Sequence, residues 1–214
     1  MDGYSLGILK PRPIWTAIKL KNQMKTSAVE ACDNDLAKDA AGGKVAAFKE
    51  LVERYQKRAY LFARGMVHNS DDAYDLSQEA FVRVYKHLKN FNPTYPFKVW
   101  LFHILSNLCK NHLRQKKLHD KVVIPTDSDY EPDIPIDDNP DTLYGHSEIQ
   151  EQVWKAINSL PHKFREIIIL CHFQEMSYEE VSQVLEIPRG SVMSRLYYAR
   201  LKLREIIEQM GLEL

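Results

Sequence analysis

Apolar residues recur at three- and four-residue spacing along most of the chain from Lys44 onward, which places them on one face of an α-helix. The first such stretch carries Phe48, Leu51, Val52, Tyr55, Ala59, Phe62 and Ala63. Asn69-Ser70-Asp71 interrupts this stretch and supplies side chains that can cap a second helix. A loop with two prolines over residues 90–96 precedes a third helix, expected over residues 97–117. Because no alternating strand pattern of useful length appears, the sequence predicts an all-α protein.

Residues 118–147 break the helical pattern with four prolines, eight acidic residues and one lysine. Such a composition favours an extended, mobile linker. The helical pattern resumes at residue 148 and continues to the C-terminus. The sequence therefore predicts two small helical domains, residues 35–117 and 148–214, joined by a flexible acidic linker. Residues 1–34 are expected to form a flexible N-terminal extension.

Residues 177–204 carry the most informative pattern, two short helices separated by a tight turn. Ser177 and Glu180 have the spacing of a capping box, in which two side chains satisfy free backbone N–H groups at a helix start. Pro188 removes a backbone donor and separates this helix from the next. The second helix has a narrow apolar stripe formed by Val192, Leu196, Ala199 and Leu203. The order of these elements predicts a helix-turn-helix.

The outward side of the second helix places aromatic and hydroxyl side chains between two flanks of cations, and residues 189–204 contain no acid. This arrangement suits the major groove of DNA, where base edges lie between two rows of phosphates. A solvated amphipathic helix is the alternative. The residues expected to contact duplex DNA are Arg189, Ser191, Ser194, Arg195, Tyr197, Tyr198 and Arg200.

The formal net charge is zero, but the charge is segregated along the chain. Residues 44–117 carry 14 Lys and Arg against 6 Asp and Glu, whereas residues 118–147 carry 1 against 8. A basic front domain followed by an acidic segment is consistent with a nucleic-acid partner.

The helix expected over residues 97–117 has a second polar face that could also meet nucleic acid. Its members are His103, Asn107, Lys110, Asn111 and Arg114. Asparagine can pair with a base, and lysine and arginine suit phosphates. In the preceding loop Phe91, Tyr95 and Phe97 could stack on an unpaired base. The alternative, favoured for Phe97, is that these aromatic rings attach the loop to the core.

Asp75, Gln78 and Glu79 share one exposed face of the second helix. An acidic face within a basic domain is a candidate protein-docking surface, although a merely solvated face is the alternative.

Enzymatic motifs are absent from the sequence, which contains no Gly-rich phosphate loop, nucleophile elbow, HExxH or CxxC pair. We therefore expect no catalysis and no metal or other cofactor. The three cysteines are widely spaced and odd in number, which fits a reducing cytoplasm better than a disulfide scaffold. The half zinc site of Cys109 and His112 has no second pair, so a core cysteine is the better interpretation. No apolar run approaches the roughly 20 residues of a membrane span, so no membrane insertion is expected.

Taken together, these stretches resemble bacterial sigma factors of the extracytoplasmic-function (ECF) group within the sigma-70 family. The sequences DAYDLSQEAFVRVYKHL (72–88) and FKVWLFHILSNLCKNHLR (97–114) resemble sigma region 2. The stretch INSLPHKFREIIILCHFQEMSYEEVSQVLEIPRGSVMSRLYYARLKL (157–203) resembles region 4. The ordered pair of motifs, with only a linker between them, is typical of this group.

The resemblance implies an alternative sigma factor that binds core RNA polymerase and directs promoter-specific transcription initiation. It implies that Asp75, Gln78 and Glu79 dock on the β′ clamp helices and that region 4 meets the β flap. Asn107 and Asn111, with the preceding loop, would read and open the −10 element, while helix 189–204 would read the −35 element as duplex. The resemblance also implies a monomer when bound to polymerase, a bacterial cytoplasmic location and an anti-sigma partner. The alternative is a stand-alone helix-turn-helix transcription regulator.

Four features depart from the common family pattern. Met193 and Tyr198 occupy positions that are often basic, so the −35 preference is expected to differ or to be weaker. Tyr74 replaces a commonly acidic residue, and Ser182 a common alanine. The two prolines of the loop 91–96 put its base preference in doubt.

Overall fold

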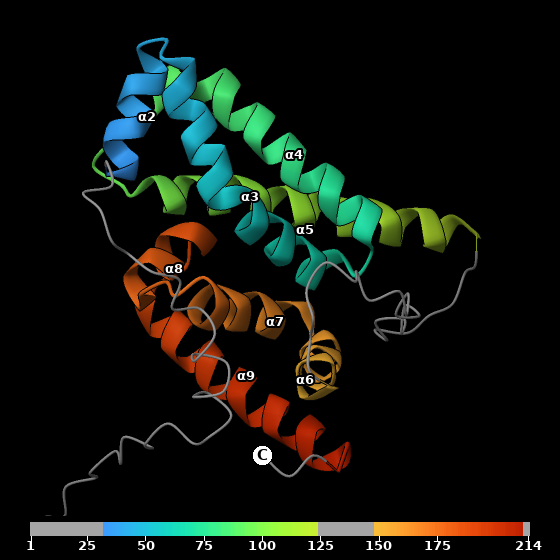
Figure 1. Ribbon diagram of the computed structural model, residues 1–214. Coiled ribbons are helices and arrows are strands. Elements are labelled where there is room, and N and C mark those ends of the chain that lie inside the picture. Colours follow the sequence, from blue (N-terminus) through green and yellow to red (C-terminus); the bar gives the residue numbers. More distant parts are fainter. Residues whose placement is uncertain (1–31, 124–147, 212–214) are drawn as a thin grey trace, which may run out of the picture.

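The computed structural model describes residues 32–123 and 148–211, and every regular element within these ranges is helical. The front domain comprises α2 (Asp33–Ala41), α3 (Val45–Val67), α4 (Ser70–His87), the 3-10 turn η1 (Leu88–Asn90) and α5 (Phe97–Val123). The rear domain comprises α6 (Glu148–Asn158), α7 (His162–Ile168), the π-helical turn η2 (Ile169–Phe173), α8 (Tyr178–Leu185) and α9 (Arg189–Gln209). Figure 1 shows the front domain lying across the rear domain. The predicted all-α architecture of two small domains is confirmed.

The core of the front domain forms where α3 packs against α2, α4 and α5. Leu51 and Phe62 of α3 are fully buried, as the spacing predicts. The ring of Phe62 meets Phe102 of α5 edge to face, with centroids 5.5 Å apart. Such aromatic pairs add about 1 kcal/mol beyond their buried area. This packing fixes the direction of α5, which carries one of the predicted nucleic-acid faces.

The helix boundaries follow local signals in the sequence. The side chain of Asn69 accepts a hydrogen bond from the backbone N–H of Asp72 (2.8 Å) at the start of α4. At the start of α8, the Ser177 hydroxyl accepts from the Glu180 N–H (3.2 Å), and the Glu180 carboxylate accepts from the Ser177 N–H (2.8 Å). The predicted capping box is therefore confirmed.

Two predicted boundaries are wrong. Helix α5 continues to Val123 and so includes the first six residues of the segment predicted as linker. The first proline after α5 is Pro125, so nothing in those six residues forces the helix to end. The rest of the predicted linker lies outside the described residues. At the other end α2 begins at Asp33, so Asp33 and Asn34 belong to the folded domain rather than to the N-terminal extension, of which residues 1–31 lie outside the described residues.

The two domains pack closely against each other, which the sequence pattern did not indicate. Helix α5 lies against α8, and α3 lies against α6, α7 and η2. As a result α5 is buried on two sides. Phe97, Leu101, Leu105 and Leu108 are buried on one side of the helix, and Val99, Phe102, Ser106 and Cys109 are buried on the other.

Candidate nucleic-acid and protein interfaces

The polar face predicted on α5 is present, but only part of it is open to solvent. Asn107, Asn111 and Arg114 are exposed. The Arg114 guanidinium donates to the Asn111 side-chain oxygen at 3.3 Å, and the Asn107 amide contacts the His103 ring at 3.1 Å. Side chains held by one another in this way present amide and guanidinium groups on a rigid helix. Such groups can pair with base edges and phosphates.

His103 and Lys110, from the same face, contact the rear domain. The His103 Nδ1 atom lies 3.1 Å from the carbonyl oxygen of Val184 in α8. The Lys110 ammonium lies 3.1 Å from the Glu166 carboxylate of α7. Both side chains are therefore partly covered, and the structure does not bring all five predicted residues together on one open surface.

The loop before α5 is held in place by a residue that the sequence analysis missed. The Asn34 amide donates to the carbonyl oxygens of Pro93 (2.9 Å) and Tyr95 (3.1 Å), and its oxygen accepts from the Phe97 N–H (2.8 Å). Tyr95 is exposed, so its ring is available for stacking. Phe97 is fully buried and makes edge contacts with Phe91, which supports the structural interpretation of Phe97. No local pattern around Asn34 could have indicated contacts 59 to 63 residues away.

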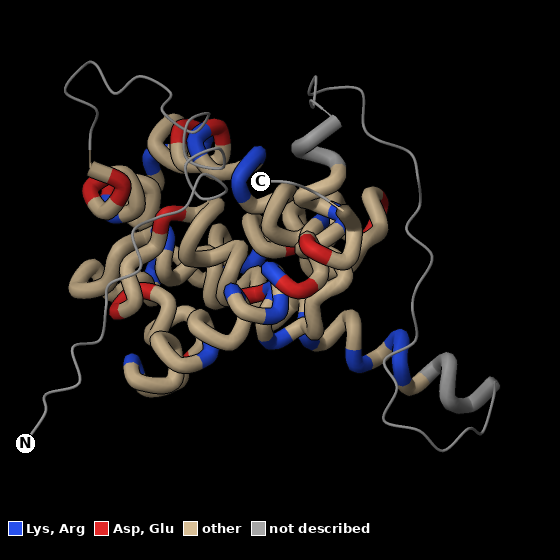
Figure 2. Tube along the Cα trace, turned by 90° about the horizontal axis from the view of Figure 1, so that it is seen from below, with Lys and Arg blue, Asp and Glu red and all other residues tan. Residues whose placement is uncertain are grey.

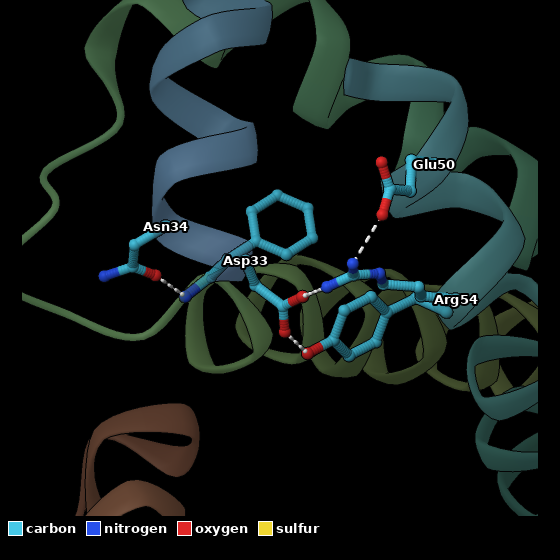
Figure 3. A network of polar contacts seen from close by, with 6 residues as sticks. Asp33, Asn34, Glu50 and Arg54 are labelled. Atoms are coloured by element: carbon cyan, nitrogen blue, oxygen red, sulfur yellow. Dashed lines mark hydrogen bonds and ion pairs between the residues drawn. The ribbon is translucent and has the colours of Figure 1, made fainter. Parts of the chain in front are cut away.

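Helix α2, which carries Asn34, is itself fixed to α3 (Figure 3). The Asp33 carboxylate accepts from the Arg54 guanidinium at 2.7 Å and from the Tyr55 hydroxyl. Arg54 also donates to Glu50 at 2.5 Å. Burial, together with the hydrogen bond to Asp33, raises the pKa of Tyr55. This network connects α2, the central helix α3 and the loop into one support for α5.

On α4, Asp75 and Gln78 are exposed, and Glu79 is half-buried and paired with Arg83 at 2.7 Å. Beside them lies an exposed apolar set that the sequence analysis did not assign, consisting of Tyr74, Val82 and Tyr85. Positions 74, 78 and 82 are four residues apart, so this spacing was available as a signal. The face therefore combines carboxylates with apolar side chains, a composition suited to a protein partner.

On α9, the predicted inward stripe is buried, and the opposite side carries Arg189, Ser194, Tyr197 and Tyr198 as exposed residues. The rings of Tyr197 and Tyr198 meet edge to face with centroids 5.5 Å apart. The other predicted DNA contacts, Ser191, Arg195 and Arg200, are partly buried.

The Arg200 guanidinium lies 3.2 Å from the His172 ring of η2. This side chain therefore packs against the rear domain and does not extend fully into solvent.

Basic residues are concentrated at the end of α5. Figure 2 shows Lys and Arg recurring along the part of this helix that projects from the domain. The cations that continue the Asn107 face are Lys110, Arg114 and Lys117, which follow it at three- and four-residue spacing. Such a row of cations can follow a phosphate backbone.

The start of α8 is also an electrostatic contact between the domains. The Lys98 ammonium of α5 lies 2.7 Å from the Glu180 carboxylate. Burial pushes the pKa of Glu180 upward, but hydrogen bonds from Lys98 and from Ser177 outweigh it, and the pKa is lowered overall. Glu180 therefore stays ionised while it serves both the capping box and the contact with α5.

The described part of the chain contains no group of three His, Cys, Asp or Glu side chains that could hold a metal ion. Cys109 is completely buried, and this burial raises the pKa of its thiol to about 12. No helix among the described residues is long and apolar enough to cross a membrane.

Comparison with known proteins assigns both domains. The family model "Sigma-70 region 2" matches residues 51–119, and "Sigma-70, region 4" matches residues 150–203. The chain therefore belongs to the sigma-70 family, whose members direct transcription initiation.

The similar curated proteins define the group. The ECF RNA polymerase sigma factor SigE of Mycolicibacterium smegmatis is 33% identical over 178 residues, which are 82% of this chain and 68% of that protein. The RNA polymerase sigma-H factor of Pseudomonas aeruginosa and the ECF RNA polymerase sigma-E factor of Escherichia coli are each 34% identical, over 78% of this chain and 90% of each relative. The chain is thus an ECF sigma factor, and its function is that of an alternative sigma factor in transcription initiation.

Two solved structures share the fold. CnrH in complex with the cytosolic domain of CnrY has a TM-score of 0.62 and 26% identity, covering 83% of this chain and 97% of that chain. The sigma factor RpoE in complex with the anti-sigma factor NepR, from Bartonella quintana, has a TM-score of 0.61 and 26% identity, covering 75% and 96%.

Proposed function

We propose that the two domains divide promoter recognition between two helices, α5 and α9. The front domain, predicted over residues 35–117, would serve as region 2 and read the −10 element. The rear domain, predicted over residues 148–214, would serve as region 4 and read the −35 element. The observation that carries this proposal is that each domain presents one helix whose exposed face combines cations with amide, hydroxyl or aromatic groups.

For the −10 element, the exposed residues Asn107, Asn111 and Arg114 would contact the opened strand, with Tyr95 stacking on a base. His103 and Lys110 belong to the same face and would join it when they are uncovered. For the −35 element, α9 would enter the major groove with the side that carries Arg189, Ser191, Ser194, Arg195, Tyr197, Tyr198 and Arg200. The exposed tyrosines favour contact with base edges and thymine methyl groups, while the arginines suit phosphates.

Core RNA polymerase would bind the α4 face. Asp75, Gln78 and Glu79 would meet the β′ clamp helices, and the neighbouring Tyr74, Val82 and Tyr85 would supply apolar contact area. The rear domain would contact the β flap. In this role the protein carries no catalytic site of its own, works as a monomer on the polymerase and acts in the bacterial cytoplasm, where the polymerase is.

An anti-sigma protein is a further proposed partner. The structurally similar RpoE was solved with the anti-sigma factor NepR, and CnrH with the cytosolic domain of CnrY. A chain with two exposed nucleic-acid faces and an apolar docking face on α4 has surfaces that such a protein could cover.

The proposal is tested by run-off transcription with core RNA polymerase and promoters identified by sequencing transcript 5′ ends after overexpression. We expect initiation that depends on this chain and starts at one fixed distance from two shared sequence elements. Tight, specific binding of the isolated chain to duplex DNA without any gain in initiation would instead indicate a stand-alone regulator.

A further inference from the structure

The loop of residues 91–96 and the start of α5 receive hydrogen bonds from a different helix. Pro96, the residue immediately before α5, has no side-chain oxygen that could cap the first turn. The cap comes instead from α2, where the Asn34 side-chain oxygen accepts from the Phe97 N–H at 2.8 Å. A side chain that lies 63 residues earlier in the sequence therefore helps to fix where α5 begins.

The other end of the Asn34 side chain holds the loop. Its amide nitrogen donates to the carbonyl oxygens of Pro93 at 2.9 Å and of Tyr95 at 3.1 Å. An asparagine side chain offers two N–H donors at one end and an acceptor oxygen at the other. Asn34 therefore uses both ends of its amide on one short segment of the chain.

Tyr95 is the loop residue that these bonds fix most closely. Its N–H donates to the backbone oxygen of Asn92 at 3.2 Å, and its own carbonyl oxygen accepts from Asn34. The Asn92 side-chain oxygen also accepts from the Thr94 N–H at 3.0 Å, which closes the turn from within. The backbone of Tyr95 is thus bonded on both sides, while 46% of the residue is exposed. Its ring is therefore carried by an ordered backbone and is open to a ligand.

Helix α2 is a fixed support for Asn34, because the neighbouring Asp33 is bonded to α3 (Figure 3). The Asp33 carboxylate accepts from Arg54 and from the Tyr55 hydroxyl. The Tyr55 ring in turn meets the Phe97 ring edge to face, with centroids 5.6 Å apart. Asn34 caps the same Phe97, so these contacts form a closed circuit through α2, α3 and α5.

We propose that Asn34 is a positioning residue for recognition of the −10 element. Its two donors hold the loop in the conformation in which the Tyr95 ring stacks on one unpaired base. This role rests on the proposed function of the loop and α5. A ring carried by an ordered backbone loses less conformational freedom on binding than a ring on a mobile loop. Because every base has a face on which a ring can stack, the effect should fall on capture of the base at one position and not on its identity.

Two substitutions separate the bonds to the loop from the cap of α5. Asn34→Asp keeps an oxygen for the Phe97 N–H, but an ionised carboxylate has no donor for the two loop carbonyls. Asn34→Leu has a similar volume and removes all three bonds without adding a charge. The matched control is Asp35→Asn, which changes the charge by one at an exposed position of the same helix. This control should leave the loop and promoter opening as in the wild type.

The contact itself is tested by residue-resolved hydrogen exchange on the full-length chain, without DNA or polymerase. In Asn34→Leu we expect faster exchange of the Tyr95 and Phe97 amides, because the loop opens more often. In Asn34→Asp only the Tyr95 amide should exchange faster, since the cap of Phe97 is kept. Wild-type exchange of the Tyr95 amide in both variants would refute the hold of Asn34 on the loop, whatever the protein does in transcription.

The effect on the −10 element is measured with core RNA polymerase on promoters identified from transcript 5′ ends. Each nucleotide of the non-template strand of this element is replaced in turn by an abasic residue, and opening is followed by permanganate reactivity. With the wild type we expect one abasic position to slow opening by about tenfold, because one stacked base is lost. Asn34→Asp and Asn34→Leu should open the intact promoter about tenfold more slowly, and the abasic residue at that position should then have no further effect. Binding to core polymerase should be unchanged.

Tyr95→Ala shows whether Asn34 acts through the ring. The double variant Asn34→Asp with Tyr95→Ala should open promoters no more slowly than Tyr95→Ala alone. Wild-type opening by Asn34→Asp, or fully additive losses in the double variant, would overturn the positioning role and leave Asn34 as a cap of α5. If the wild-type chain supports no initiation, the proposed function fails and the positioning role with it, while the exchange result still shows whether Asn34 holds the loop.

Discussion

At the scale of single residues, Asn107 is the most informative position of the proposed −10 face. It is exposed, and its side chain contacts His103 of the same helix, so its replacement should leave the fold intact. A side chain paired with a base contributes about 1–3 kcal/mol of discrimination. We expect Asn107→Ala to slow promoter opening by about tenfold, measured by permanganate reactivity of unpaired thymines.

The matched control for Asn107 is Gln115→Ala, which removes an exposed amide elsewhere on α5. It should open promoters at the wild-type rate. Both variants should bind core polymerase normally, and an equal loss of core binding in Asn107→Ala would assign a structural role to Asn107.

His68 is expected to make the free energy of unfolding depend on pH. It ends α3 with a left-handed backbone, and its ring contacts the Arg165 guanidinium. Burial, and then the positive charges of Arg165, Arg64 and Lys116, lower its pKa to about 3.

Below its ordinary pKa of about 6.5 the unfolded chain binds a proton that the folded chain does not, so His68 lowers the stability as the pH falls from about 6.5 to 3. Asn also tolerates the left-handed conformation. We therefore expect His68→Asn to remove about 1 kcal/mol of the stability loss between pH 7.5 and 5.5, measured by urea unfolding. An unchanged pH dependence would exclude His68 as its source.

At the scale of elements, α8 depends on its capping box. Ser177→Ala removes one acceptor at the helix start and should lower the free energy of unfolding of the protein by about 1 kcal/mol. Ser194→Ala, at an exposed position of α9, should change it by less than about 0.5 kcal/mol. Urea denaturation of the two variants gives the comparison, and equal effects would mean that the box does not stabilise α8.

Elements were predictable wherever local chemistry decides them. Asn69 caps α4, Ser177 and Glu180 cap α8, and the spacing of Val192 and Leu196 gives the buried stripe of α9. The end of α5 was not predictable in the same way. The acidic composition of residues 118–147 favours a linker, but it does not prevent the first residues of this segment from continuing the helix.

At the scale of the whole molecule, the buried residues of both domains form one continuous core. Wild-type calorimetry should therefore give one cooperative transition. In Glu166→Lys the domains should unfold separately, and the trace should split into two transitions. A single transition in both proteins would mean that the domains remain coupled without the contacts of Glu166 with Ser106 and Lys110.

Half of the candidate −10 site could not be predicted from sequence patterns. The spacing of Asn107, Asn111 and Arg114 placed them on one face, and the structure leaves them exposed. Lys110 is partly covered because it pairs with Glu166, which lies 56 residues further along the chain. The conformation of the loop before α5 depends on its hydrogen bonds with Asn34. Pairings at such separations are set by how helices pack, which no local periodicity records.

By itself the sequence determined the helical class, the two domains, the caps and the helices that carry the proposed nucleic-acid faces. These properties follow from spacing, capping and charge within about one or two helical turns, and those quantities can be read along the chain. Only the tertiary structure decided that α5 is buried on two sides and that the domains meet through the Glu166–Lys110 ion pair and at Gly65, where a Cβ atom would lie 2.5 Å from Ile169 of the rear domain. The physical reason is that the energetic effect of a buried charge, or of a glycine without a side chain, depends on the atoms packed against it. Those atoms come from parts of the chain that are distant in sequence.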